Sequence, residues 1–416
     1  MTRKLHDVLI IGAGPAGLSL AAALQGSGLS VLLVERQPEA ALVEPRFDGR
    51  EIALTQLSVR HMQDLGQWAR IDPAERSPLK RAKVLNGPSS LALWVDPDNA
   101  HDELGFLVPN HLIRKAAFGT AFEAAIGRPA DNVSLRACVA VRRIARESDQ
   151  VAVELESGEV LHTRLAVAAD SRFSETRRAM GIAADMHDFG RSMMVCRMAL
   201  EVDHEHVAWE WFGHGQTLAL LPLNGPVASA VITLPHRDIE SLMQLDDAGF
   251  NREMTQRFDG RLGAMHQVGT RHAYPLVGVY ARRFVGPRFA CVGDAAVGMH
   301  PVTAHGFNFG LAGAISLAAG IREAAARGED FAAPGVLERW ERHHRAFTRP
   351  LYLATNALAT LYADERAPAR LLRTAALTAS RLLPPVRRAM SAAVTGGSAA
   401  PHPLSRMAAG AFSRMR

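Results

Sequence analysis

The chain has few of the residues that would cross-link it or bind metal. Its three cysteines, Cys138, Cys196 and Cys291, are widely spaced among 416 residues and form no CxxC pair. This spacing argues against a disulfide framework and a cysteine-rich metal site, and it favours a reducing compartment. The 17 histidines show no metal-ligand spacing either. We therefore expect no metal.

Long hydrophobic runs are also missing. No stretch of 18 apolar residues occurs, and the best candidate, residues 218–234, is interrupted by Pro222, Asn224, Gly225 and Pro226. Such an interruption predicts two strands and a turn rather than a membrane span. The first residues lead directly into a strand pattern, without the profile of a signal or transit peptide. These features predict a cytoplasmic protein.

Acidic residues are absent from the end of the chain. Residues 366–416 contain nine arginines and no lysine, aspartate or glutamate, and since the whole chain carries +5, the preceding residues carry −4. A basic terminal segment is not the charged face expected of a nucleic-acid binder. Two interpretations stay open for this basic helical tail. It lies on the anionic inner face of a membrane as a peripheral contact, or it packs on the body with a solvated basic face.

The clearest positive signal is the glycine motif at residues 8–17, VLIIGAGPAG. A buried strand, G-x-G-x-x-G, a helix and an acid about 20 residues on are the marks of a dinucleotide site. Gly12 permits the turn, Gly14 lets the backbone approach a pyrophosphate, and Gly17 allows close helix packing. Glu35 is placed for a ribose diol. Ala16 and Arg36 are further candidates for contact with the cofactor.

A second signal decides which dinucleotide is bound. An apolar strand at 289–292 ends in Gly293-Asp294, and a proline loop then leads to a glycine-rich helix over 311–326. Asp294 suits a polyol, Gly306 allows close approach to a ring, and Asn308 is a candidate polar contact. The positive end of this helix would stabilise a flavin that becomes negative on reduction. FAD needs such a distant second site, whereas NAD does not.

The remaining pattern predicts an α/β chain with an antiparallel sheet. We expect one helix to about Trp68, another beginning at Asn110, a third over 238–258, and helices from 334 to 383. We expect a hairpin at 83–95 and strands at 133–144, 151–156, 160–169, 193–200, 207–212, 217–222 and 227–234. The aromatic residues Trp209, Trp211 and Phe212 line the substrate sheet or form its core.

These motifs resemble the class A flavoprotein aromatic hydroxylases. Within them, the chain is similar to the ubiquinone-biosynthesis hydroxylases of the UbiH, UbiF and UbiM types, most of all to UbiM. The resemblance covers roughly residues 5–350. It rests on the following segments: Gly12 to Arg36, Arg50-x-x-Ala53-Leu54, the Asp170 turn, Tyr274-Pro275-Leu276, and Gly293-Asp294 through His300-Pro301-Val302 to Gly306-x-Asn308.

Two segments depart from the family pattern. Ala168-Ala169-Asp170-Ser171 replaces Gly-Ala-Asp-Gly, and Ala304-His305-Gly306 replaces Gly-Gln-Gly. Ser171 is therefore expected to occupy a backbone position that favours glycine, and nicotinamide binding at this turn is a weaker expectation. We take Ala304-His305 as a mark of the UbiM subgroup, which is associated with hydroxylation at ring position 5 of a demethoxyubiquinol.

The resemblance implies a doubly wound, Rossmann-like FAD-binding domain of the p-hydroxybenzoate hydroxylase type, an antiparallel-sheet substrate domain and a helical C-terminus. The expected FAD-binding domain is discontinuous, over 1–75, 103–180 and 276–365, with the substrate domain over 76–102 and 181–275 and the tail over 366–416. FAD, NAD(P)H and O2 would hydroxylate a polyprenyl phenol or quinol through a flavin C4a-hydroperoxide. The alternatives are a small soluble aromatic substrate and a non-catalytic flavin-binding subunit of a quinone-synthesis complex.

The resemblance also assigns roles to single residues. Arg50, Asn110 and Asp170 join the cofactor-binding set, and Pro301 is expected against the flavin edge. His305 is the local candidate for proton transfer, since its ordinary pKa lies near neutrality. A purely structural hydrogen bond for His305 is equally open, and His300 is expected to be structural.

Overall fold

The computed structural model describes residues 5–87, 92–97, 102–123, 132–213, 215–303 and 305–363. Ala304, the basic tail at 366–416 and the part of the expected helical segment beyond residue 363 lie outside these ranges.

The first sheet is built around the glycine motif. Its parallel strands stand in the order β8-β2-β1-β11-β19, which is the doubly wound order 3-2-1-4-5. Four of them, β1, β2, β11 and β19, are buried along most of their length and end in apolar residues on both faces, as parallel strands covered on both sides do. Their bounds are β1 Leu5–Ile11, β2 Val31–Val34, β8 Val133–Arg136, β11 Val160–Ala168 and β19 Phe289–Cys291.

Antiparallel strands extend this sheet on two sides. The short β18 (Val285–Gly286) pairs with β19, and β10 (Val151–Leu155) pairs with both β11 and β9 (Val141–Arg146). The strand expected over 133–144 is therefore two strands. Residues 133–136 pair with β2 in the parallel sheet, and the chain then turns so that 141–146 pairs with β10. A single apolar pattern could not reveal this change of partner.

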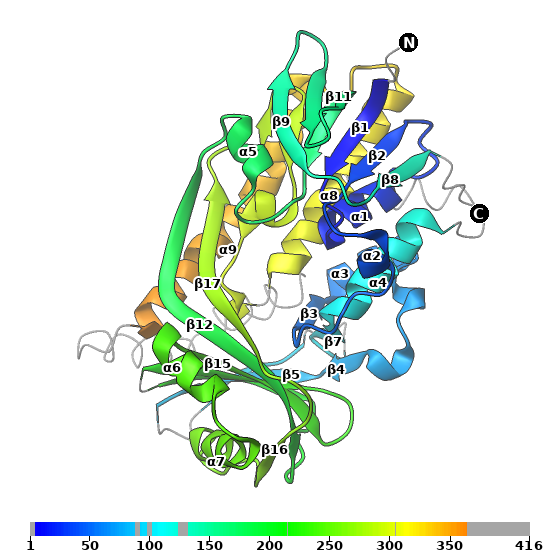
Figure 1. Cartoon of the computed structure of the whole chain (residues 1–416). Coiled ribbons are helices and arrows are strands. Elements are labelled where there is room, and N and C mark those ends of the chain that lie inside the picture. The colour runs from blue at the N-terminus through cyan, green and yellow to red at the C-terminus, as the bar shows by residue number, and fades with distance from the viewer. Residues whose placement is uncertain are drawn as a thin grey trace.

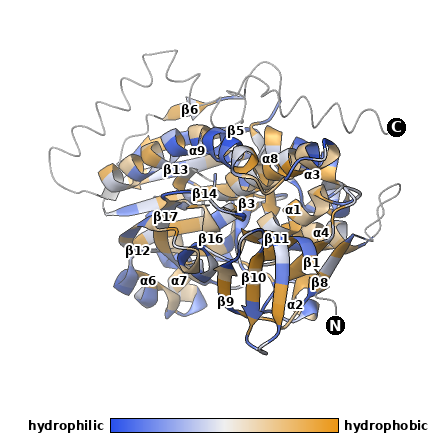
Figure 2. Ribbon diagram, turned by 90° about the horizontal axis from the view of Figure 1, so that it is seen from above, coloured by the Kyte–Doolittle hydropathy of each residue, from blue (hydrophilic) through white to orange (hydrophobic). Residues whose placement is uncertain are grey.

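Helices cover one face of the first sheet. Contacts link α1 (Pro15–Ala23) to α8 (Gly306–Ala326) and α4 (Asn110–Phe122), and α8 to α9 (Pro334–Ala363). Figure 1 shows α8 running beside α1 through the middle of the molecule, and Figure 2 shows that α8 is largely hydrophobic. By length and composition α8 is the one described helix that could cross a membrane. Half of its most apolar stretch is buried inside the protein, as in a core helix.

The second sheet has the order β20-β17-β12-β15-β14-β13-β5-β6. The four strands expected between 193 and 234 pair antiparallel as predicted, although β12 begins nine residues earlier, at Ala184. The expected hairpin is confirmed by the β5–β6 pair. The bounds are β5 Arg81–Asn86, β6 Leu93–Val95, β12 Ala184–Leu200, β13 Val207–Gly213, β14 Gln216–Pro222, β15 Val227–Pro235, β16 Met265–Gln267, β17 His272–Ala281 and β20 Val297–Gly298.

The two faces of this sheet have different environments. Trp209 and Trp211 belong to a buried cluster with Phe250 and Met254 of α7 (Asp247–Arg257), so this outer face forms a core. α6 (His236–Met243) covers the same face. The helix expected over 238–258 is two helices, because the chain breaks after Gln244 and Asp246 caps the second one by accepting from the Gly249 N–H.

A small third sheet lies between the other two. β3 (Glu51–Thr55), β7 (Gly105–Pro109) and β4 (Ser77–Leu79) pair antiparallel around β7. These three strands were not predicted, because their apolar and polar residues show no clear alternation. The connecting segments are short helices: α2 Glu39–Val43, α3 Gln56–Leu65, α5 Glu175–Ala179, η1 Trp68–Arg70, η2 Pro73–Glu75, η3 Gly293–Ala295 and η4 Pro301–Thr303.

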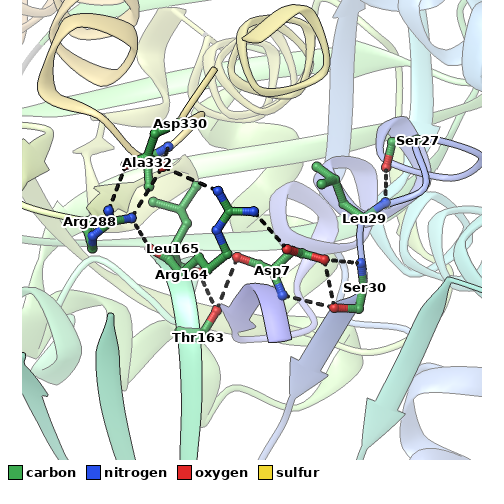
Figure 3. A network of polar contacts seen from close by, with 10 residues as sticks. All are labelled: Asp7, Ser27, Leu29, Ser30, Thr163, Arg164, Leu165, Arg288, Asp330 and Ala332. Carbon is green, nitrogen blue, oxygen red and sulfur yellow. Dashed lines mark hydrogen bonds and ion pairs between the residues drawn. The ribbon is translucent and has the colours of Figure 1, made fainter. Parts of the chain in front are cut away.

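A charged network joins the first sheet at the end away from the glycine loop (Figure 3). Asp7 accepts from the Ser30 N–H (2.9 Å) and pairs with Arg164 (3.3 Å), while Asp330 pairs with Arg288 (2.6 Å). Burial would raise the pKa of Asp330, but hydrogen bonds and the nearby arginines hold it below its ordinary value. The network fixes the amino ends of the parallel strands, so their carboxyl ends are left for the site.

The predicted domain limits can be placed on these elements. The expected limit at 275/276 falls inside β17, a strand that pairs with β12 along most of its length. The limit at 180/181 falls between α5 and β12, and the limit at 75/76 between η2 and β4. The domain boundaries remain predictions.

Candidate functional site

The glycine loop forms a cradle at the carboxyl end of β1. Gly12 has φ +107°, and a Cβ placed there would lie 2.5 Å from the carbonyl oxygen of Ala169. A Cβ on Gly17 would lie 2.1 Å from the Gly12 oxygen, whereas a Cβ on Gly14 would meet only one atom, at 3.9 Å. Gly12 and Gly17 are therefore required by packing. Gly14 leaves open space at the N-terminus of α1, where backbone N–H groups have no helical acceptor.

Ala16 connects the two motifs that are farthest apart in the sequence. A Cβ on Gly293 would lie 2.8 Å from the Ala16 Cβ, and one on Gly310 would lie 3.7 Å from it. Gly293 has φ +60°, which favours glycine. The start of α1, the Gly293-Asp294 turn and the start of α8 are thus packed against one another.

Glu35 lies beside the glycine loop as predicted. One carboxylate oxygen accepts from the Ala13 N–H (2.7 Å) and the other from the Gln37 N–H (2.9 Å). Each oxygen can accept a further bond, so a ribose contact stays available. The neighbouring Arg36 is exposed, and its side chain forms no hydrogen bond or ion pair with the described residues.

Asp170 follows β11 directly and closes the cradle. Its Cα would lie 2.8 Å from a Cβ on Gly12, and its Oδ2 accepts from the Thr176 N–H at 3.5 Å. Its buried Oδ1 has no hydrogen-bond partner within the described chain. A buried carboxylate oxygen without a partner is a feature that a ligand or water normally satisfies.

Ser171 does not need a glycine conformation. It is not among the described non-glycine residues with positive φ, and its Oγ accepts from the Phe173 N–H at 3.2 Å. The expectation of backbone strain at Ser171 is therefore wrong. The serine hydroxyl supports a turn that does not enter the left-handed region.

Asp294 lies in η3 at the end of β19 and is paired. Its Oδ2 accepts from Arg172 at 3.1 Å, and Arg172 also donates to the carbonyl of Val277 (3.3 Å). Arg177 fixes the same region, since its buried guanidinium donates to the carbonyls of Ala295 (2.8 Å) and Arg172 (3.3 Å). Neither arginine was predicted from the sequence, because Val277, Asp294 and Ala295, which they bind, lie more than 100 residues farther along the chain.

The N-terminus of α8 is open where the resemblance placed a flavin ring. A Cβ on Gly306 would have no atom within 4 Å. Asn308 is used differently from the expectation, since its Oδ1 accepts from the Thr55 N–H (3.2 Å) and its Nδ2 donates to the Ala53 carbonyl (2.9 Å). These bonds tie α8 to β3 and leave cofactor contact by the Asn308 side chain a prediction.

Pro301 and His305 lie in the segment that leads into α8. Pro301 begins η4 and is exposed, while His305 precedes α8 and is buried, with its ring 5.6 Å from that of Phe309. His300 is buried edge-on to Phe189 (4.6 Å), and desolvation lowers its pKa to about 4. This supports a structural role for His300. The roles of His305 and Pro301 remain predictions.

A separate cluster is centred on Asp48, which sequence reasoning missed. Arg50 pairs with it at 2.5 Å, Asn110 donates to the same oxygen at 2.8 Å, and Tyr274 donates to its backbone carbonyl at 2.6 Å. Burial would raise the pKa of Asp48, but the hydrogen bonds and charge of Arg50 bring it below its ordinary value. Arg50 and Asn110 are thus brought together, but through a carboxylate that lies two residues before Arg50.

A buried ion pair joins this cluster to the second sheet. Arg197 of β12 contacts Glu51 of β3 at 2.7 Å, and the Glu51 side chain is fully buried. Desolvation raises the pKa of Glu51 despite the opposing charge of Arg197. The pair holds the second sheet over the segment that carries Arg50.

Comparison with known proteins assigns the family. Residues 6–351 match the FAD binding domain family. The chain is 46% identical over 399 residues to the ubiquinone hydroxylase UbiM of Neisseria meningitidis, spanning 94% of this chain and 85% of that protein. The chain belongs to the FAD-dependent ubiquinone hydroxylases. The predicted family, its enzyme class and its use of FAD are thereby confirmed.

Other ubiquinone hydroxylases and solved structures agree with this family. The chain is 33% identical to UbiL of Rhodospirillum rubrum, over 92% of this chain and 88% of that one. PqsL of Pseudomonas aeruginosa (22% identity, TM-score 0.71, 87% and 97% covered) shares the fold. So does p-nitrophenol 4-monooxygenase PnpA of Pseudomonas putida (17% identity, TM-score 0.73, 95% and 99% covered). The predicted fold class is confirmed.

The cradle of this ubiquinone hydroxylase suits FAD on its own geometry. Space lies above Gly14 and Gly306, and the buried Asp170 oxygen has an unused acceptor. These features lie at the carboxyl ends of parallel strands, where open α/β sheets bind ligands. The pyrophosphate would be held at Gly14 and the ring near Gly306.

Proposed function

We propose that this protein is an FAD-dependent monooxygenase of ubiquinone biosynthesis that hydroxylates the aromatic ring of a polyprenyl phenol or quinol, with NAD(P)H and O2 as co-substrates. The observation that carries the proposal is the open cradle between Gly14, Asp170 and Gly306 in a chain 46% identical to a ubiquinone hydroxylase. Demethoxyubiquinol, hydroxylated at position 5, is the substrate that the UbiM-type sequence favours.

Different residues would bind different parts of the cofactor. Gly12, Gly14, Ala16 and Gly17 form the pyrophosphate cradle, and Glu35 would hold a ribose. Asp294 and Asp170 stand at the strand ends, and the N-terminus of α8 would stabilise negative charge on the bound ring by about 0.3–1 kcal/mol. Bound flavin supplies the oxygen chemistry, while the protein positions the rings and excludes water.

A lipid-like substrate is supported by the inner face of the second sheet. On that face Ala208, Ala219, Val231 and Met193 are only half-buried, although the alternate residues on the outer face are buried. Apolar side chains that remain partly exposed are available to line a small-molecule site. A prenyl tail would cover them.

We place the protein in the cytoplasm, with access to lipid substrate at the inner face of the membrane. The basic composition of residues 366–416 supports peripheral contact with anionic lipid. Removal of residues 366–416 should then reduce sedimentation with anionic vesicles without changing FAD content. Equal sedimentation of both proteins would contradict this placement.

The proposed activity is tested on the quinone pool. Cells that lack the gene should accumulate one under-hydroxylated polyprenyl intermediate, and restoring the gene should remove it. Its mass and fragmentation identify the ring position. An unchanged pool in a strain without a second hydroxylase would favour a soluble aromatic substrate. Bound FAD without substrate-dependent NAD(P)H oxidation would favour a non-catalytic flavin-binding subunit.

A further inference from the structure

The inner face of the second sheet carries one carboxyl group in an apolar row. In register across the sheet, Glu210 of β13 lies between Val84 of β5 and Ala219 of β14. The row continues through Val231 to Val195. Side chains in register point to the same face. Glu210 is therefore the acidic member of a row whose other members from Val84 to Val195 are apolar, and which reaches His272 on β17.

Among the described residues, Glu210 forms no ion pair. The nearest cation along the neighbouring strand, Lys83, lies on the opposite face, with its ammonium 3.6 Å from the centre of the Trp209 ring. The Glu210 side chain is only partly exposed to solvent. Desolvation alone raises its pKa well above the ordinary value. The neutral form, which both donates and accepts hydrogen bonds, is thereby favoured.

The position of Glu210 relates it to the cofactor cradle. Asn308, at the start of α8, donates to the Ala53 carbonyl. Ala53 and Ala208 pack against the same small cluster of Leu79, Val95 and Leu104. Glu210 is two residues beyond Ala208 on the same face, about 6.6 Å farther along the strand. The sheet face that carries Ala208 and Glu210 is thus the face turned toward β3, which Asn308 ties to the start of α8.

We infer that Glu210 binds the ring hydroxyl of the aromatic substrate and so fixes which ring carbon faces the cofactor. This inference rests on the proposed function and adds a residue to it. A partly buried carboxyl among apolar side chains, with no hydrogen-bond partner among the described residues, is poorly solvated, so a phenolic O–H that lies against this face gains a hydrogen bond there. The apolar neighbours Val84, Ala219 and Val231 would contact the ring or its tail.

The test compares a phenol with its methyl ether on the FAD-loaded protein. Binding of 2-geranylphenol and 2-geranylanisole is followed by the change in the flavin absorption spectrum, so no turnover is needed. The wild-type protein should bind the phenol about ten-fold more tightly than the ether, a ratio equivalent to one hydrogen bond. Glu210→Leu should reduce this ratio to near one, and Glu210→Gln should retain most of it.

The control is Glu240→Gln, an exposed glutamate on α6, which should leave the ratio unchanged. FAD content and far-ultraviolet circular dichroism establish that each variant is folded and loaded. If wild type discriminates between phenol and ether and Glu210→Leu discriminates equally, the inference is wrong and the proposed function stands. If wild type binds both ligands equally, the inference is also wrong. If it binds neither, the proposed substrate class fails with it.

Discussion

The guanidinium of Arg172 lies 3.1 Å from the carboxylate of Asp294 and also donates to the carbonyl of Val277. The three residues come from the loop after β11, the end of β19 and the middle of β17. This single side chain therefore connects both large sheets at the point where the cofactor is expected. It orients the carboxylate that the sequence assigned to a polyol.

Replacing Asp294 tests the cofactor assignment directly. Asp294→Ala should lose FAD while the protein remains folded, because the side chain is partly exposed and its ion pair contributes little to stability. Arg172→Gln should weaken FAD binding by about two- to five-fold, since it removes a partly exposed ion pair with Asp294 and the bond to the Val277 carbonyl but leaves the Asp294 carboxylate in place. Flavin fluorescence titration measures both affinities. Full FAD occupancy in Asp294→Ala would refute the assignment.

Two glycines should respond in opposite ways to the same substitution. Gly17→Ala would place a Cβ 2.1 Å from the Gly12 oxygen and should lower both thermal stability and FAD content. Gly306→Ala meets no atom and replaces glycine within a helix, so stability should be unchanged or slightly higher. FAD affinity or substrate-dependent turnover should nevertheless fall if a ring occupies that space. Unchanged affinity and turnover in Gly306→Ala would place the ring elsewhere.

Removing one partner of the Glu51–Arg197 pair should lower the free energy of unfolding much more than replacing both partners with apolar residues. Arg197→Met leaves a buried carboxylate without its counter-ion and should lower the free energy of unfolding by about 3–5 kcal/mol. The double variant Glu51→Leu/Arg197→Met should recover most of this loss, because no buried charge remains. Urea unfolding of the FAD-free proteins measures both values. Equal losses in the single and double variants would indicate that packing, not charge, dominates.

The loss of folding stability at acid pH should depend on His344 of α9. The ring is buried and stacked on Trp340, and desolvation lowers its pKa from 6.5 to about 4. Below pH 6.5 the unfolded chain takes up the proton and the folded one does not, so stability falls by up to about 1.4 kcal/mol per pH unit until about pH 4. His344→Phe should reduce this slope in urea unfolding between pH 6.5 and 4.5. Replacing the exposed His266 with glutamine is the control, and equal slopes in His344→Phe and wild type would contradict the prediction.

Glu210 should affect the pH dependence of stability in the opposite direction from His344, at pH values above the ordinary pKa of a glutamate. Because folding raises that pKa, the folded protein holds the proton more tightly, and its stability falls as pH rises above the unfolded value. Glu210→Gln should therefore raise the melting temperature at pH 8 relative to wild type and raise it less at pH 5. Thermal unfolding at the two pH values measures the difference. A lower melting temperature at pH 8 would show that the carboxylate is satisfied in the fold.

Local patterns were sufficient wherever neighbouring residues determine the structure. The strand, glycine turn and helix at residues 8–23 follow from apolar runs and from backbone positions that exclude a side chain, and the structure has them as predicted. The four strands from 193 to 234 were likewise visible from their alternation and turns. The helix over 238–258 failed as a single element because Asp246 starts a new one.

The sequence by itself determined the family, the cofactor and the pieces of the cradle, because glycine positions and strand ends are local properties. Only the tertiary structure decided what each polar side chain contacts. Asp48 binds Arg50, Asn110 and Tyr274. Asn308 binds the backbone of β3. Arg172 pairs with Asp294, which lies 122 residues farther along the chain. The face on which Glu210 lies was decided in the same way, because it depends on strand register across the whole sheet.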